Sequence, residues 1–239
     1  MSDPPRAKRA YNSQRRQQQA EATRLAMLQA AQRLFERDGY VATTVEDIAT
    51  EAGVALKTVY SAFTTKAGLL RALWDLLLKG DSDEAPVAQR AWYRSVLEEA
   101  DAERQLRLLA AGACSVKVRI GALLKVIRSA SVVDPDSAAL WQLIQSDFYE
   151  NQRAIVSTLH ARRGLRPGLS ATEATDILWS LNHPDVWLLL VDQRGWTPQA
   201  FEAWFADTLC QQLLDTTSAG RTPVRRSPRS ATQRHLGQP

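Results

Sequence analysis

Apolar residues recur at three- and four-residue spacing along almost the whole chain between residues 23 and 215. In the first such segment Leu25, Leu28, Ala31 and Leu34 fall on one face of a helix. No stretch shows the two-residue alternation of a strand, and no internal repeat is present. The spacing therefore predicts an all-α protein.

Glycine residues and an Asp-Pro-Asp turn divide this pattern into segments. We expect helices over residues 23–38, 45–52, 56–63, 65–79, 86–100, 102–130, 136–163, 170–193 and 198–215. Pro184 lies inside the penultimate segment and should kink that helix, because proline has no backbone N–H to donate. The polar run Gly-Asp-Ser-Asp at residues 80–83 is the expected boundary between two domains.

The two ends of the chain are polar and basic. Residues 1–20 hold five Lys/Arg and one Asp, and residues 217–239 hold five Arg and no acid. Because such ends bury too little apolar area to offset chain entropy, we expect a flexible basic arm over residues 1–20 and a disordered basic tail over residues 218–239. The whole chain has a net charge of only +4, so the body between the ends is acidic. This distribution suits a protein that meets a polyanion at particular places.

Composition argues against several classes of protein. The two cysteines, Cys114 and Cys210, are too few for a disulfide framework and favour a cytoplasmic protein. Apolar runs are far shorter than the about 20 residues that cross a membrane, so we expect no membrane span. The three histidines lie far apart and no catalytic motif occurs, so we expect no enzyme, no metal and no cofactor.

The block over residues 44–63 meets the requirements of a helix-turn-helix. Ala49 and Ala52 are small enough for two short helices to cross closely, and Gly53 suits a turn with positive φ. The side chains expected beneath the two helices are Val45, Ile48, Val54, Val59 and Phe63. The outward side chains of the second helix, available to the major groove of DNA, are then Leu56, Lys57, Tyr60, Ser61 and Ala62.

The longer stretch around this block resembles the DNA-binding domain of the TetR family of transcriptional regulators, over about residues 24–75. The matching residues are Met-Leu-Gln-Ala-Ala-Gln-Arg-Leu-Phe at 27–35, Gly39-Tyr40, Thr-Thr-Val-Glu-Asp-Ile-Ala at 43–49, Gly53-Val54, Thr58-Val59-Tyr60, Phe63, Lys66 and Leu69-Leu70. The resemblance implies a three-helix helix-turn-helix domain over residues 21–80. A linking helix would join it to a C-terminal helical ligand-binding and dimerisation domain over residues 81–217.

The resemblance also implies roles for single residues in DNA binding. The side chains implied to bind backbone phosphates are Thr44, Thr58, Tyr60 and Lys66. Lys57 and Ser61 are the expected base readers, and Leu56 or Ala62 can meet a thymine methyl group. Ala55 stands where a capping serine is frequent, so the recognition helix lacks a side-chain N-cap, at a cost of ~1 kcal/mol. Because Ser61 is small, part of the specificity is expected to come from DNA shape.

The last two expected helices are apolar on more than one face. This argues for burial in a bundle, made by one chain or by two. The resemblance implies a four-helix interface between two protomers, and the expected interface residues are Trp187, Leu190, Phe201, Trp204, Phe205 and Leu209. We interpret His183, next to Pro184, as structural.

A ligand pocket is implied mainly by the family resemblance. The candidate lining residues are Leu123, Ile127, Trp141, Ile144, Phe148 and Trp179. Their spacing fits a packed core equally well. Candidate polar selectors are Asp147 and Tyr149.

The sequence thus predicts a homodimeric, sequence-specific DNA-binding transcriptional regulator. We expect a repressor that a small apolar or aromatic effector releases from a palindromic double-stranded DNA operator. Two alternatives stay open, because fold does not decide function. One is a helical protein-interaction module, and the other is a TetR-type activator without a small-molecule inducer.

Overall fold

The computed structural model describes residues 6–79, 87 and 90–215, and in this part of the chain it is helical with no strand. The N-terminal helices are α1 (Arg6–Ala42), α2 (Val45–Glu51), α3 (Leu56–Phe63) and α4 (Lys66–Lys79). The helices that follow are α5 (Ala91–Glu98), α6 (Ala102–Ala130), α7 (Pro135–Ala161), α8 (Ala171–Leu181), α9 (Pro184–Trp187) and α10 (Pro198–Leu213). The all-α fold predicted from the sequence is confirmed.

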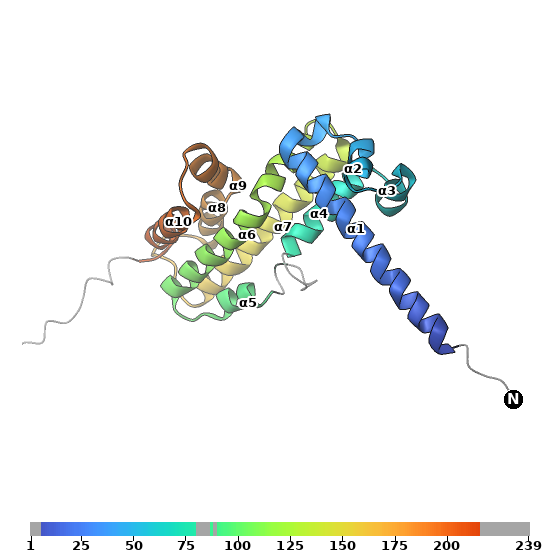
Figure 1. The fold of residues 1–239 in the computed structure, drawn as a ribbon. Helices are drawn as coiled ribbons and strands as arrows, with labels where there is room; N and C mark the ends of the chain where they lie inside the picture. The colour runs from blue at the N-terminus through green and yellow to red at the C-terminus, as the bar shows by residue number, and fades with distance from the viewer. Residues whose placement is uncertain (1–5, 80–86, 88–89, 216–239) are drawn as a thin grey trace, which may run out of the picture.

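The first helix is longer than expected at its N-terminal end. We expected a flexible arm over residues 1–20, whereas α1 begins at Arg6 and projects away from the rest of the molecule (Figure 1). Residues 6–22 contain no glycine or proline, and their Gln, Ala, Arg and Glu residues favour a helix. The tail over residues 218–239 lies outside the described residues.

Gly39 interrupts α1 near its C-terminal end. Its backbone has φ 81° and ψ 168°, which is not helical. The break turns Tyr40 onto Phe35, with the two ring centroids 5.7 Å apart. The glycine expected to stop the helix therefore bends the chain and places Tyr40 in the core, where it is 5% exposed.

The helix-turn-helix forms where the sequence predicts it. Thr44 caps α2 by accepting a hydrogen bond from the Asp47 backbone N–H. Gly53 has φ 66° in the turn between α2 and α3. Ala55 gives α3 no side-chain cap, as expected. In the next turn, Thr65 caps α4 by accepting a hydrogen bond from the Gly68 backbone N–H at 2.9 Å.

The C-terminal part is built on the long antiparallel pair α6 and α7, with α10 packed on α6 and α8 packed on α7 (Figure 1). The expected single helix over residues 170–193 is divided into α8, α9 and a π-helical turn over Leu188–Gln193. Pro184 begins α9, and the His183 ring accepts a hydrogen bond from the Asp185 backbone N–H at 3.2 Å. The effect of Pro184 is thus a new helix start and not a kink.

The apolar core consists of two clusters, which do not divide at the expected boundary near residue 80. The first joins α1 to α4 with the C-terminal half of α6 and the N-terminal half of α7. The second joins α5, the N-terminal half of α6, the C-terminal half of α7 and the last helices. The helix-turn-helix therefore packs directly against α6 and α7. Within the described ranges, no helix is long and apolar enough to cross a membrane.

Candidate nucleic-acid interface and internal pocket

The recognition helix α3 presents three of the five side chains of the predicted outward set to solvent. Val59 and Phe63 are buried, at 1% and 7% exposure. The exposed side chains of α3 are Lys57, Thr58, Tyr60 and Ser61, whereas Leu56 and Ala62 are half-buried. Helical geometry places Lys57, Thr58 and Ser61 opposite the buried face and Tyr60 on its flank. The arrangement fits base readers on the outward face of the helix and a phosphate ligand at the edge of that face.

Thr44 is exposed, but its hydrogen-bonding groups are already engaged. Its hydroxyl donates to the Asp47 carboxylate at 2.6 Å, and its backbone N–H donates to the same carboxylate at 3.0 Å. The hydroxyl bond lowers the pKa of Asp47. A phosphate bound by the Thr44 hydroxyl would have to compete with this carboxylate.

Lys66 lies differently from Lys57. Its ammonium nitrogen is 4.2 Å from the centroid of the Tyr40 ring, and the side chain is half-buried. Burial lowers the pKa of Lys66. The Tyr40 hydroxyl donates to the Asp134 carboxylate at 3.2 Å, and burial raises the pKa of Tyr40 to about 12. Lys66 therefore lies at the junction between α1, α4 and the start of α7.

Arg24 joins the recognition helix to α1, a role that the sequence analysis did not predict. Its guanidinium donates to the Ala62 carbonyl at 3.2 Å and lies over the Phe63 ring, 4.4 Å from the centroid. The two partners are 38 and 39 residues away, and no local signal in the sequence joins them. Arg24 holds the C-terminal end of α3 in place.

A pocket of about 300 Å³ lies between α4, α5, α6 and α7. Its apolar side chains include Trp74, Leu78, Val116, Ile120, Leu124, Ile144 and Phe148. Its polar side chains include Arg71, Asp75, Arg90, Lys117, Gln145, Asp147, Asn151, Gln152 and Asn182. The pocket combines apolar walls with a smaller number of polar side chains, which is typical of small-molecule sites.

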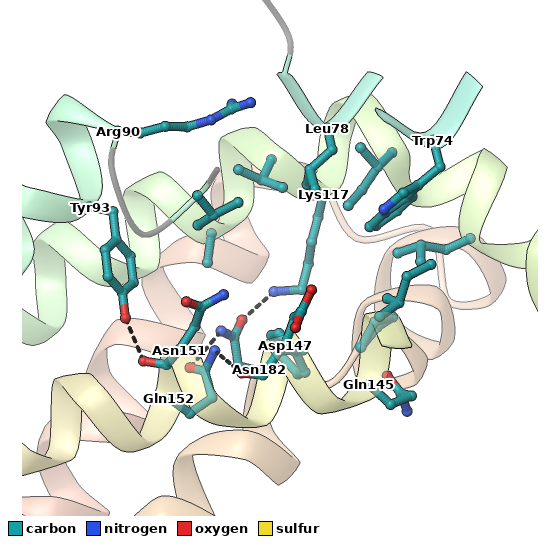
Figure 2. Close-up of a pocket in the computed structure, with 18 of the residues that line it drawn as sticks. Trp74, Leu78, Arg90, Tyr93, Lys117, Gln145, Asp147, Asn151, Gln152 and Asn182 are labelled. Carbon is teal, nitrogen blue, oxygen red and sulfur yellow. Dashed lines mark hydrogen bonds between the residues drawn. The ribbon is translucent and has the colours of Figure 1, made fainter. Parts of the chain in front are cut away.

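Buried amides and one ammonium form a hydrogen-bonded cluster at this pocket (Figure 2). The Lys117 ammonium donates to the Asn182 side-chain carbonyl, and the Asn182 amide donates to Gln152 at 3.1 Å. Burial lowers the pKa of Lys117 to about 7. Nearby, the Tyr93 hydroxyl donates to the Asn151 backbone carbonyl at 2.6 Å. The chain thus buries a titratable amine beside an apolar cavity.

The structure places only part of the expected lining set at this pocket. Ile144 and Phe148 line it, as does the expected selector Asp147. Leu123 and Ile127 are instead fully buried in the first core cluster, and Trp141 packs against that cluster. Trp179 stacks edge-on against Tyr149 and His183. Helical spacing shows which face of a helix is turned away from solvent. It does not show whether that face packs against another helix or lines a cavity, and the prediction was incomplete for this reason.

The expected dimer residues need a similar correction. Phe201, Phe205 and Leu209 are 0% exposed, and Trp187 is 6% exposed, within a single chain. They belong to the second core cluster, because α10 packs this face on α6. A partner subunit cannot contact side chains that are already covered. Leu190 and Trp204 are half-buried and stay available, and Leu189 and Trp196 are exposed apolar neighbours that the prediction omitted.

Sequence reasoning missed Lys117, Asn182 and Gln152. One signal was present for Lys117, since it interrupts the apolar face of α6 between Ala113 and Ile120, at helical spacing. No comparable signal marked the two amides.

Fold and site together define an all-α protein with a helix-turn-helix domain packed against a helical domain that holds an internal pocket. Residues 27–73 match the family described as bacterial regulatory proteins, tetR family. This match lies within the segment whose residues resemble the TetR family, and it agrees with the resemblance found in the sequence.

A curated transcriptional regulator matches part of the chain. The chain is 41% identical over 63 residues to the HTH-type transcriptional regulator TtgR of Pseudomonas putida. That match covers 26% of this chain and 30% of the relative, so it spans less than a third of the relative's length.

Solved structures extend the likeness to the remaining helices. NalD, the secondary repressor of the MexAB-OprM multidrug efflux pump in Pseudomonas aeruginosa, superposes with a TM-score of 0.62 at 21% identity, over 83% of this chain and 99% of that chain. SmeT in a complex with triclosan gives a TM-score of 0.64 at 16% identity, over 89% of this chain and 100% of that chain. At these identities the likeness shows a shared fold.

Proposed function

We propose that this chain is a homodimeric transcriptional repressor that binds a palindromic DNA operator and is released from it by a small molecule. The observation that carries the proposal is the exposed polar face of α3 in a helix-turn-helix of the tetR family. Two such helices, one from each protomer, would enter successive major grooves about 34–36 Å apart. The basic residues of α1, including the exposed Arg15 and Arg16, would add phosphate contacts.

The helix α4 offers a route from the pocket to the DNA-binding face. Trp74 and Leu78 of α4 line the pocket, while the first turn of the same helix lies against the C-terminal end of α3. A molecule that occupies the pocket and displaces α4 would therefore move α3. The contacts of Lys66 with Tyr40, and of Tyr40 with Asp134, would change with it. Because such coupling is reciprocal, operator DNA would weaken binding of the effector.

Duplex selection followed by a salt titration tests the proposal. A DNA library is selected on the purified protein, and fluorescence anisotropy measures affinity for the enriched duplex at several salt concentrations. We expect a palindromic site whose affinity falls steeply with salt, because phosphate contacts release counterions. No enrichment of any duplex, or binding that ignores salt, would contradict a DNA-binding role and favour a protein-interaction module. A reporter gene placed behind the selected site then distinguishes repression from activation.

Tyr60→Phe should weaken binding to all duplexes alike. The change removes one hydroxyl from an exposed flank of α3 and no charge. Since a hydrogen bond to a charged group contributes about 1.5–3 kcal/mol, we expect a loss of roughly tenfold or more in affinity. Fluorescence anisotropy on the selected duplex and on a scrambled duplex measures the loss.

The matched control is Tyr149→Phe, which removes a hydroxyl that donates to Asp176 of α8, a helix on the far side of the molecule from α3. It should leave DNA affinity unchanged. Lys57→Ala should instead alter the preferred sequence, because Lys57 is exposed on the outward face of the first turn of the recognition helix. Equal affinities for Tyr60→Phe and the unaltered protein would remove Tyr60 from the DNA contacts.

A further inference from the structure

The side chain of Lys117 ends in a buried ammonium group with few partners. The residue is 6% exposed and lies in the middle of α6. One of its three N–H groups is directed at the Asn182 carbonyl oxygen. The rings of Phe201 and Phe205 also lie near the ammonium, with their centroids 5.8 Å and 5.5 Å from the Lys117 nitrogen. These contacts solvate the charge partly and leave capacity for a further acceptor.

No carboxylate of the described residues lies within 4.0 Å of this nitrogen. On the same helix, the exposed Lys125 is paired with Asp192 at 2.5 Å. Asp147 lines the pocket but is exposed and is not in ion-pair contact with Lys117. A buried ammonium without a counter-ion is costly, and a bound anion would offset that cost.

The remaining cations of the pocket are already engaged. Arg71 is paired with Asp75, with 3.4 Å between the guanidinium Nε and the carboxylate. Arg90 has an interaction of its own. Lys117 is therefore the group best able to accept an anionic ligand, and its single charge suits a monoanion.

Apart from the amides beside the ammonium, most of the cavity wall is apolar. Trp74, Leu78, Ile120 and Phe148 line the cavity, and Figure 2 shows the lysine reaching into it from α6 toward Asn182. A ligand that fits must thus combine an apolar body with one anionic end. The cavity of about 300 Å³ limits that body to a short chain or a small ring.

We infer that this pocket binds a small amphipathic monocarboxylate, with its carboxylate on Lys117 and Asn182 and its apolar body between α4, α6 and α7. Such a monocarboxylate would be the effector of the proposed repressor. Only its effect on DNA binding rests on the proposed function. The test of ligand binding uses no DNA. If the protein binds no carboxylate, the result of the operator titration does not change. If the operator titration shows no DNA binding, the result of the ligand titration does not change.

A ligand series that differs only in charge tests the inference. Octanoate, octan-1-ol and octylammonium share a chain length and differ in the polar end. Isothermal titration calorimetry on the full chain should show octanoate bound at least tenfold more tightly than octan-1-ol, and octylammonium more weakly than either. Equal affinities for octanoate and the alcohol would overturn the inference. A preference for octylammonium would also overturn it and would point to Asp147 as the anchor.

Lys117→Met removes the ammonium but keeps a side chain of similar length in the core. Because a buried unpaired charge is lost, the variant should fold. We expect the preference for octanoate over octan-1-ol to disappear, with affinity for the alcohol kept or raised. The matched control, Lys125→Met on the exposed face of α6, should keep the full preference. A Lys117→Met protein that still prefers octanoate tenfold would show that another group holds the anion.

Affinity for octanoate should also depend on pH. The pKa of Lys117 is lowered to about 7 by burial, and a bound carboxylate would raise it again. Above pH 7, binding of octanoate therefore requires Lys117 to take up a proton. The affinity for octanoate should fall by up to about tenfold per pH unit as the pH rises above 7. Cys114 on α6 and His183 before α9 interact electrostatically with Lys117, Asp147 on α7 lines the same pocket, and Glu202 on α10 is a neighbour of Cys114. The Lys117→Met variant removes only the contribution of the lysine to the pH dependence of octanoate binding. If the variant and the unaltered protein show the same pH dependence, Lys117 is not the group that holds the carboxylate.

Discussion

Replacing Phe201 by alanine should lower the free energy of unfolding by about 3–5 kcal/mol, the usual cost of removing a fully buried aromatic side chain. Phe201 is 0% exposed. Its ring contacts Trp187, Trp204 and Phe205, with centroids 4.9, 5.6 and 5.8 Å away. Truncation would leave a cavity between α10 and α6 that these rings cannot fill. Urea denaturation followed by circular dichroism measures the loss.

The same experiment separates a core residue from an interface residue. For a core residue, the loss of stability is the same at low and high protein concentration. For an interface residue, the variant would dissociate into folded monomers, and its stability would rise with concentration. Leu189→Ala is the control, because Leu189 is 51% exposed and should cost less than about 1 kcal/mol in the monomer. A large concentration dependence for Phe201→Ala would place it at a subunit contact after all.

Gly68→Ala should destabilise the helix-turn-helix domain by about 3 kcal/mol, because the new methyl group would meet backbone. A Cβ at this position would lie 2.2 Å from the Phe63 carbonyl oxygen and 3.3 Å from the Thr65 hydroxyl. Relief requires α4 to move away from the C-terminal end of α3. We expect a fall in melting temperature of roughly 10 °C. Weaker DNA binding should accompany it, because the recognition helix loses its support.

Gly112→Ala provides the comparison. Its Cβ would lie 2.3 Å from the Trp92 ring, which is equally close. Trp92 is half-buried on the short helix α5, so its side chain can rotate away at lower cost than a backbone carbonyl can move. Differential scanning calorimetry of both variants should give the larger shift for Gly68→Ala. Shifts of equal size would show that α4 can move freely relative to α3, and the proposed coupling through α4 would lose its support.

Local signals predicted the helix-turn-helix well. Gly53 supplies the positive φ of its turn, and the apolar spacing of Val59 and Phe63 marks the buried face of α3. These features depend on residues within about one or two helical turns of each other, so the sequence shows them directly. The start of α1 was predicted less well, because residues 6–22 are polar on all sides and carry no apolar stripe.

Contacts between segments that are distant in the chain could not be predicted from the sequence. The Lys117 ammonium meets Asn182, 65 residues further along the chain, and Tyr40 meets Asp134, 94 residues away. Helical periodicity showed that Leu123 and Phe201 would be buried. It did not show that α1 and α4 would pack over Leu123, or that α6 would pack over Phe201.

The sequence by itself thus determined the helical class, the recognition helix and the buried face of α3, because backbone geometry relates neighbouring residues in a fixed way. Tertiary packing alone decided where a cavity remains, which apolar faces one chain covers for itself, and that an amine is buried beside that cavity. These properties depend on how distant helices fill space together, and a pattern along one helix does not specify its neighbours.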